Sequence, residues 1–214
     1  MKSDGRPRVL IATAGFGDGH NSAARNLAKA LASQAEARII DPCAEGAPLL
    51  NHLLRSGYRV VTTYLPSVWG RIYRSAERRD FSRQRAPMLH LAERALAAQI
   101  DSFDPHVLVS TYPLYPYFVE RYVKAGGRER PLVTVITDSI EINAAWRKAP
   151  SHYWLVTDHD TRRDLIEKKI PEERLVETGF PVDPAFASLP SPGADDPVRP
   201  FRVLFFPTSK RPTV

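Results

Sequence analysis

The residues best suited to chemistry lie in one short, glycine-rich segment, Ala14–His20, with the sequence AGFGDGH. This segment joins an expected strand to an expected helix, and its glycines would let a ligand approach main-chain N–H groups closely. The N-terminus of the following helix offers free donors and a partial positive charge, which favour an anion or a developing oxyanion. We therefore expect a binding or catalytic site at this loop.

Three interpretations of the loop compete. A phosphate-binding Walker loop would end in Gly-Lys-Ser/Thr, and the Gly-His-Asn ending excludes it. A dinucleotide fingerprint fits Gly15, Gly17 and the more distant Asp41, but its third glycine position holds His20, whose ring would obstruct helix–strand packing. In the third interpretation, His20 is a general base: near a helix N-terminus its pKa is lowered, and neutral imidazole accepts a proton from a hydroxyl. The alternative that His20 only caps the helix stays open.

The elements that must position this loop alternate between short apolar strands and helices. A helix is expected at Asn21–Gln34, and Leu175–Thr178 is a candidate sixth strand after five firmer ones. Those five are Arg8–Ala14, Ala37–Asp41, His106–Thr111, Leu132–Thr137 and Tyr153–Thr157. Near-continuous apolar strands separated by helices predict an α/β fold, a Rossmann-like parallel sheet with helices on both faces.

Asp138 directly follows the fourth expected strand, so it should lie at the same carboxyl edge of the sheet as His20. Its carboxylate could orient the base or bind a hydroxyl group of a ligand. Alternatively, it could cap the next turn. The residues alone leave both roles open.

Composition limits the class of protein. The chain has 214 residues, 43% hydrophobic and 25% charged, which suits one folded α/β domain and a fraction of another. A single cysteine, Cys43, excludes a disulfide framework and a zinc cluster of paired cysteines. The net charge of +6 suits a nucleic acid, a phosphate-bearing ligand or an anionic membrane. No apolar stretch approaches the ~18 residues of a spanning helix or forms a secretory signal, so we expect a cytoplasmic protein.

The chain divides unevenly. Residues 1–183 are expected to form one domain, with a mostly helical insert at residues 44–104. Residues 184–200 are rich in proline and small residues and are interpreted as a linker. Residues 201–214 contain one further apolar strand, Phe201–Phe206, interpreted as the first strand of a truncated second domain.

The insert is basic and aromatic. From Arg71 to Arg94 it carries seven arginines against three acidic residues. Aromatic rings beside arginine suit the interface of an anionic membrane. The expected membrane contacts are Trp69, Arg71, Tyr73, Arg74 and Arg78. A solvated helix face is the alternative, whereas nucleic-acid binding is disfavoured because no recognition motif accompanies the charge.

The segment GFGDGHNSAARNLAKAL resembles the amino-terminal domain of monogalactosyldiacylglycerol synthases and of the bacterial processive diacylglycerol glucosyltransferases. The family pattern of Gly-x-Gly-His, two residues, Ala-Ala and then x-x-Leu is filled by Gly17, Gly19, His20, Ala23, Ala24 and Leu27. Further matches follow in order across roughly residues 8–206. They are Asp104-Pro105, Thr137-Asp138 with Trp146 nearby, and Gly179-Phe180-Pro181-Val182 with Phe186.

This resemblance implies the amino-terminal half of a GT-B glycosyltransferase, which transfers a hexose from a UDP-sugar to a diacylglycerol-like lipid. It implies His20 as the base, no metal or other cofactor, and a UDP-sugar bound by the missing carboxyl-terminal half. The residues carried over to acceptor binding are Gly17, Gly19, Asn21, Asp138 and Trp146. The enzyme would lie peripherally on the inner face of the cell membrane.

One departure from the family affects the acceptor side, because Asn143-Ala144-Ala145 stands where the family often has His-Pro before the tryptophan. Two other functions remain open: a nucleotide-dependent Rossmann-type enzyme, and a standalone lipid-binding module without a donor half.

Overall fold

The computed structural model describes residues 5–77, 81–82, 87–139, 142–189 and 203. Its centre is a parallel sheet of six strands in the order β2-β1-β3-β4-β5-β6. The strands are β1 (Arg8–Ala12), β2 (Glu36–Ile40), β3 (Val107–Ser110), β4 (Leu132–Val135), β5 (Tyr153–Val156) and β6 (Leu175–Glu177). The predicted α/β, Rossmann-like fold is confirmed, and the candidate sixth strand is present.

Helices follow most of the strands. The α-helices are α1 (Asp18–Leu31), α2 (Pro42–Gly46), α3 (Pro48–Tyr64), α4 (Pro66–Glu77), α5 (His90–Phe103), α6 (Tyr115–Lys124), α7 (Ala144–Arg147) and α8 (His159–Glu167). Short 3-10 helices occupy Pro87–Leu89, Glu172–Arg174 and Pro184–Ser188. Helix α1 begins three residues earlier than predicted, so His20 lies inside its first turn instead of before it.

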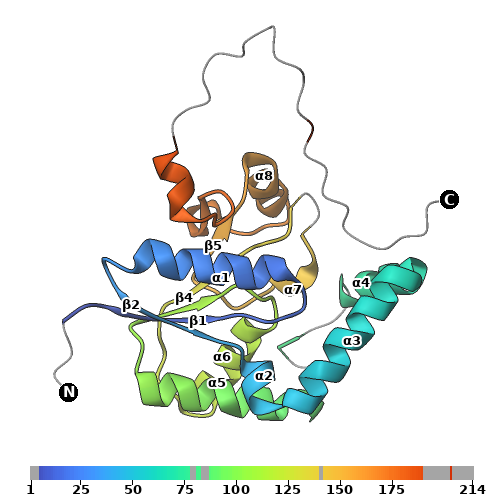
Figure 1. Ribbon diagram of the computed structural model, residues 1–214, viewed down its shortest axis with the longest axis horizontal. Helices are drawn as coiled ribbons and strands as arrows, with labels where there is room; N and C mark the ends of the chain where they lie inside the picture. Colours follow the sequence, from blue (N-terminus) through green and yellow to red (C-terminus); the bar gives the residue numbers. More distant parts are fainter. Residues whose placement is uncertain (1–4, 78–80, 83–86, 140–141, 190–202, 204–214) are drawn as a thin grey trace, which may run out of the picture.

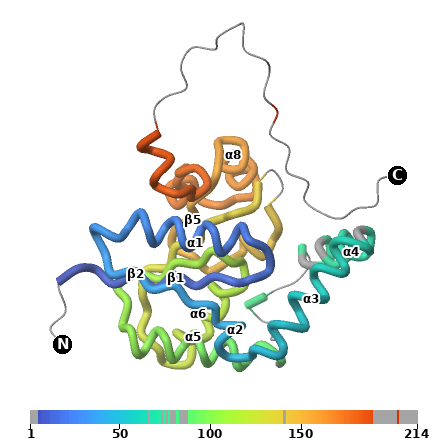
Figure 2. Tube along the Cα trace, in the orientation of Figure 1, coloured from blue at the N-terminus to red at the C-terminus, as the bar shows by residue number. Residues whose placement is uncertain are grey.

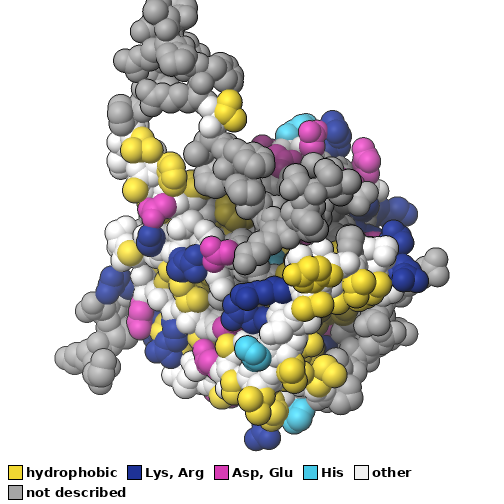
Figure 3. Space-filling model, turned by 45° about the vertical axis from the view of Figure 1, so that its right-hand side comes forward, with side chains coloured by type: hydrophobic (Ala, Val, Ile, Leu, Met, Phe, Trp, Pro, Cys, Tyr) yellow, Lys and Arg dark blue, Asp and Glu magenta, His cyan; other side chains and the backbone are white. Residues whose placement is uncertain are grey.

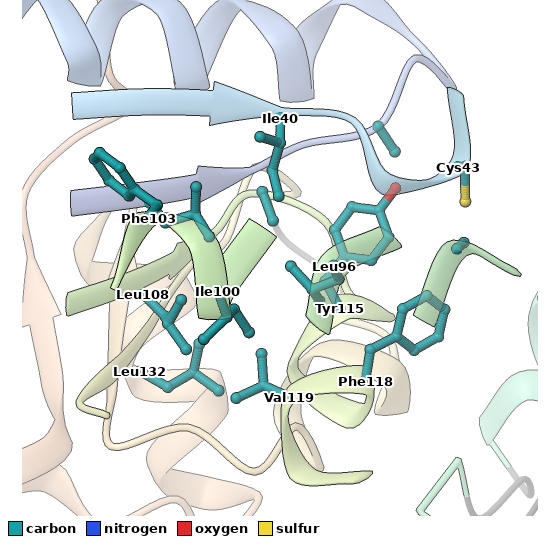
Figure 4. Close-up of a cluster of buried hydrophobic side chains, with 14 residues drawn as sticks. Ile40, Cys43, Leu96, Ile100, Phe103, Leu108, Tyr115, Phe118, Val119 and Leu132 are labelled. Carbon is teal, nitrogen blue, oxygen red and sulfur yellow. The ribbon is translucent and has the colours of Figure 1, made fainter. Parts of the chain in front are cut away.

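The alternation of side chains along β1 divides the core between the two faces of the sheet. Val9 and Ile11 pack against α1 on one face. Leu10 and Ala12 join the larger cluster on the other face. Figure 4 shows this larger cluster, in which side chains of α5 and α6 meet the sheet. Helix α1 thus covers one face, and α5 and α6 cover the other (Figure 1).

The predicted insert, residues 44–104, contains two kinds of helix. Helix α5 belongs to the core, since Leu96 and Ile100 are fully buried against the sheet. It packs so closely on α2 that a side chain at Gly46 would collide with the backbone carbonyl of Leu91. Helices α3 and α4, in contrast, project from one side of the sheet (Figures 1 and 2).

The end of the described chain returns to α1. The Lys29 ammonium lies 2.6 Å from the Asp183 carboxylate, and the Asn26 amide donates to the Pro181 carbonyl at 3.0 Å. The first residues of the predicted linker form the 3-10 helix Pro184–Ser188. Residues 190–200 of that linker and the predicted strand Phe201–Phe206, apart from Val203, lie outside the described residues. No helix in the described part of the chain is both long and apolar enough to cross a membrane.

Candidate functional site

The site lies where the strand order changes direction. From β1 the chain crosses to β2 on one side, and later strands are added on the other side of β1, beginning with β3. Open α/β sheets bind ligands beyond the carboxyl ends of the strands at such a switch point. The glycine loop leaves β1 at this point, and Thr111 and Tyr112 follow β3 beside it.

Glycine is required at the entry to α1. Gly17 precedes the helix with a φ of 135° and a ψ of 158°, a conformation nearly restricted to glycine. Gly17 and Gly19 are exposed, and a side chain at either would meet no atom within 4 Å. Asn21 accepts a hydrogen bond from the Thr13 hydroxyl at 3.0 Å, which fastens the first turn of α1 to the end of β1.

His20 points from α1 toward the ends of β3 and β4. Its Nδ1 atom lies 2.7 Å from the Oγ1 atom of Thr137, which follows β4. The ring packs edge to face with Tyr112 at a centroid distance of 5.3 Å, and it is tilted against Trp146 at a centroid distance of 5.9 Å. The imidazole is only partly buried, and the residue that precedes α1 as its cap is Gly17. The capping interpretation of His20 is therefore wrong.

Burial lowers the pKa of His20 below its usual 6.5, because a partly dehydrated site disfavours imidazolium. The Asp138 carboxylate and the Thr111 carbonyl act in the opposite direction, since both favour the protonated ring. The imidazole is therefore neutral at neutral pH. When Nδ1–H donates to the Thr137 hydroxyl, Nε2 carries the lone pair that a general base needs.

Asp138 and Trp146 form a second layer behind His20. The indole Nε1–H of Trp146 donates to Asp138 Oδ2 at 2.8 Å, and Trp146 is only 1% exposed. Asn143 caps α7 through a hydrogen bond from the Ala145 N–H, so the cap of that helix is not Asp138. The Asp138 carboxylate acts on the charge of His20 and holds the indole ring.

Asp41, the acid of the dinucleotide interpretation, is engaged within the protein. Its carboxylate accepts the Ala44 N–H at 3.0 Å and the Gly15 N–H at 3.1 Å. These bonds cap α2 and fasten the glycine loop, which leaves neither oxygen in the role of a ribose ligand. The structure therefore gives no support to dinucleotide binding at this loop.

A row of aromatic rings leads from His20 to the projecting helices. Tyr112 touches His20 and stacks on Phe16 at 5.5 Å. Phe16 meets Tyr58 of α3 at 6.4 Å, and Tyr58 meets Trp69 of α4 edge to face at 5.1 Å. The row gives the site an apolar wall continuous with α3 and α4.

Several of these residues were missed by the sequence analysis. Tyr112 lies two residues after the end of β3, and Asp138 lies three residues after the end of β4, so the edge rule that selected Asp138 could have selected Tyr112 too. Phe16 lies inside the loop itself. Arg55 of α3 gave no local signal, yet its guanidinium packs on the loop so closely that a Cβ at Gly15 would lie 2.8 Å from Arg55 Cζ. Long-range packing of this kind is invisible in a local sequence pattern.

Four of the five predicted membrane contacts, Trp69, Arg71, Tyr73 and Arg74, belong to α4. Arg71 and Arg74 are exposed, whereas Trp69 is partly buried because it packs on Tyr58. The side chain of Tyr73 and the whole of Arg78 lie outside the described residues.

Large apolar side chains are also exposed on these helices. Leu49 is 82% and Tyr64 69% exposed, and the further ones on or next to α3 and α4 are Leu53, Val60, Leu65 and Ile72. Figure 3, in which this side of the molecule comes forward, shows hydrophobic side chains gathered close to Lys and Arg side chains. Outward apolar side chains beside arginines are typical of a surface that meets a membrane interface.

Comparison with known proteins points to one family. Residues 20–182 match the family described as monogalactosyldiacylglycerol (MGDG) synthase, so the match begins at His20. The chain is 26% identical over 179 residues to a processive diacylglycerol beta-glucosyltransferase of Bacillus cytotoxicus, which covers 82% of the chain and 45% of that relative. It is 25% identical over 193 residues to the proteins of the same name from Bacillus thuringiensis and Bacillus cereus, covering 84% of the chain and 46% of each relative. The chain thus spans just under half the length of these relatives.

Proposed function

The chain belongs to the monogalactosyldiacylglycerol synthase family, and on that premise we propose that it is the acceptor-binding half of a glycolipid glycosyltransferase. The reaction transfers a hexose from a UDP-sugar to the hydroxyl of a diacylglycerol-like lipid. The observation that carries the proposal is the neutral, partly exposed imidazole of His20, held at the carboxyl edge of the sheet beside an apolar wall.

The chemistry assigns His20 a single task. An alcohol is a weak nucleophile near neutral pH, so a base must take its proton as the oxygen attacks. His20 Nε2 accepts that proton, the alcohol oxygen bonds to the anomeric carbon, and the bond from that carbon to the diphosphate breaks. The electron pair leaves on UDP, and the imidazolium then releases its proton to water. A positioned base supplies about 10²–10⁴-fold of the rate.

The surroundings of His20 support a lipid alcohol as acceptor. The rings of Tyr112, Phe16, Tyr58 and Trp69 offer an apolar path from the base to α3 and α4. An acyl chain can lie along such a path without leaving polar groups unpaired, whereas a hydrophilic acceptor would gain little from it.

We propose further that α3 and α4 bind the enzyme peripherally to the anionic inner face of the cell membrane. Exposed Arg71 and Arg74 would meet lipid phosphates, and the outward apolar side chains of α3 would enter the interface. Docking by these helices would bring the site to the surface where its water-insoluble acceptor resides.

The test uses the protein that contains the carboxyl-terminal half. It is incubated with diacylglycerol in vesicles and with UDP-glucose or UDP-galactose in parallel, and the lipid products are separated and identified by mass spectrometry. A hexosyl-diacylglycerol that needs both lipid and UDP-sugar supports the proposal. Lipid binding without transfer would favour a standalone lipid-binding module, and NAD binding by the chain would favour the dinucleotide alternative.

A further inference from the structure

Glu77, the last residue of α4, is bound to α7 by three hydrogen bonds. Its Oε1 accepts the Ala144 N–H at 2.7 Å, and its Oε2 pairs with the Arg147 guanidinium. The Lys148 ammonium donates to the Glu77 backbone carbonyl at 3.3 Å. One residue of a projecting helix thus holds both the first N–H of α7 and the basic side chains at its end.

Helix α7 depends on such contacts because it has only four residues. A single turn does not hold itself in water, so partners outside it must fix its position. Asn143 caps it locally, and Glu77 adds a carboxylate at its N-terminus, where negative charge is favourable. Ala144 is fully buried, so its N–H has no water to replace the Glu77 oxygen.

Helix α7 also contacts His20, through Trp146. Trp146 lies 5.9 Å from the His20 ring, and its indole donates to Asp138, whose charge acts on His20. The contacts therefore continue from Glu77 to α7, and from α7 through Trp146 and Asp138 to His20. No other charged side chain of the described residues is seen to act on that ring as strongly as Asp138 does.

We propose that Glu77 is a positioning residue for His20. It sets the place of α7, and through Trp146 and Asp138 it sets the orientation and proton affinity of the imidazole. The catalytic meaning of this role rests on the proposed function. Because the same helix α4 carries Arg71 and Arg74, Glu77 also joins the helix that would bind the membrane to the group that would act on the lipid.

The test observes the His20 ring by NMR spectroscopy of the 214-residue chain. The chain has six histidines, and with ¹³Cε1-labelled histidine the His20 signal is identified by its loss in His20→Asn. Glu77→Ala should shift this signal, through the changed ring current of Trp146, and should change the pKa of His20. The variant leaves the residues that face that ring, Asp138 after β4 and Tyr112 after β3, unmutated. Glu77→Gln should shift the signal less, because its amide oxygen can still accept the Ala144 N–H.

Glu172→Gln is the matched control. It removes a carboxylate that also pairs with an arginine at 2.7 Å, but this arginine is Arg162 of α8 and not a residue of α7. Arg147→Gln supplies a second variant that weakens the same contact without altering α4. Unchanged His20 signals and pKa in Glu77→Ala, Glu77→Gln and Arg147→Gln, within the difference that Glu172→Gln gives, would overturn the proposal.

An activity measurement complements the spectra. In the protein with its carboxyl-terminal half, Glu77→Ala should lower kcat by about tenfold to a hundredfold, the scale of a small misplacement of a catalytic group, and leave the KM for the UDP-sugar unchanged. The NMR spectra of His20 can be recorded whether or not the protein catalyses the reaction. Absence of glycolipid would therefore refute the proposed function alone, whereas an unmoved His20 signal would refute the role of Glu77 alone.

Discussion

The Nδ1 atom of His20 lies 2.7 Å from the Oγ1 atom of Thr137, although 117 residues separate them in the chain. His20 enters the site from the loop after β1, and Thr137 enters it after β4. Their meeting follows from the parallel sheet, whose strands all end at one edge. The orientation of the imidazole is thereby set by the sheet and does not depend on the glycine loop alone.

Asp138→Asn should lower the pKa of His20 further. The Asp138 charge favours imidazolium and partly offsets the effect of burial, which disfavours it. Removing that charge should therefore let burial lower the pKa more. The asparagine keeps an oxygen that can accept the Trp146 N–H. A pH titration of the His20 signal should therefore move to lower pH, and the acid limb of the kcat profile should move with it. A titration that moves to higher pH would show that the Asp138 charge is not acting on this ring.

Gly17→Ala should lower the free energy of unfolding, whereas Gly19→Ala should raise it. Gly17 has a φ of 135°, where a side chain costs about 1–3 kcal/mol of strain. Gly19 lies in α1 with open space around it, so alanine should stabilise that helix by about 0.5–1 kcal/mol. Urea unfolding of both variants gives the comparison. Equal free energies of unfolding would contradict the conformation assigned to the loop.

Arg71→Gln/Arg74→Gln should weaken binding to vesicles rich in anionic lipid. Each basic residue near such a surface contributes about 1 kcal/mol, so the pair should change the partition coefficient about thirtyfold. Sedimentation with vesicles measures it, and high salt should release the unaltered chain because the attraction is screened.

A control for this pair removes the same charge elsewhere. Arg128 and Arg163 are exposed away from α4, and Arg128→Gln/Arg163→Gln should bind vesicles almost as well as the unaltered chain. If both double variants lose binding equally, net charge and not α4 governs the attraction. If the chain binds neutral vesicles equally well, the basic surface has no role.

The central strands β1, β3 and β4 could be predicted because each is a short apolar run rich in branched residues and largely buried within a parallel sheet. The location of His20 and Asp138 at one edge of the sheet followed from the same prediction, because parallel strands all end at that edge. The projection of α3 and α4, in contrast, depends on contacts such as that of Arg55 with the glycine loop, which link segments about 40 residues apart. An amphipathic helix shows that one face is apolar but does not show which partner covers it.

Within the site, the glycine motif selected the loop and His20 but not the residues that pack around them. Asn21, expected at the acceptor, accepts a hydrogen bond from Thr13 that its local sequence does not indicate. Trp146, also expected there, lies buried behind His20. Glu77 counted only as one acidic residue in a basic segment, because its partners Ala144 and Arg147 come about 70 residues later. Such pairings arise from tertiary packing and leave no periodic signal.

If the His20 imidazole takes the proton of the acceptor alcohol, His20→Asn removes the group that does so. The protein with its carboxyl-terminal half is assayed for hexosyl-diacylglycerol at saturating lipid and UDP-sugar, and urea unfolding checks that the variant folds. We expect kcat to fall by about 10²–10⁴-fold while the free energy of unfolding stays within about 1 kcal/mol. A folded variant whose kcat stays within threefold of the unaltered enzyme would contradict it.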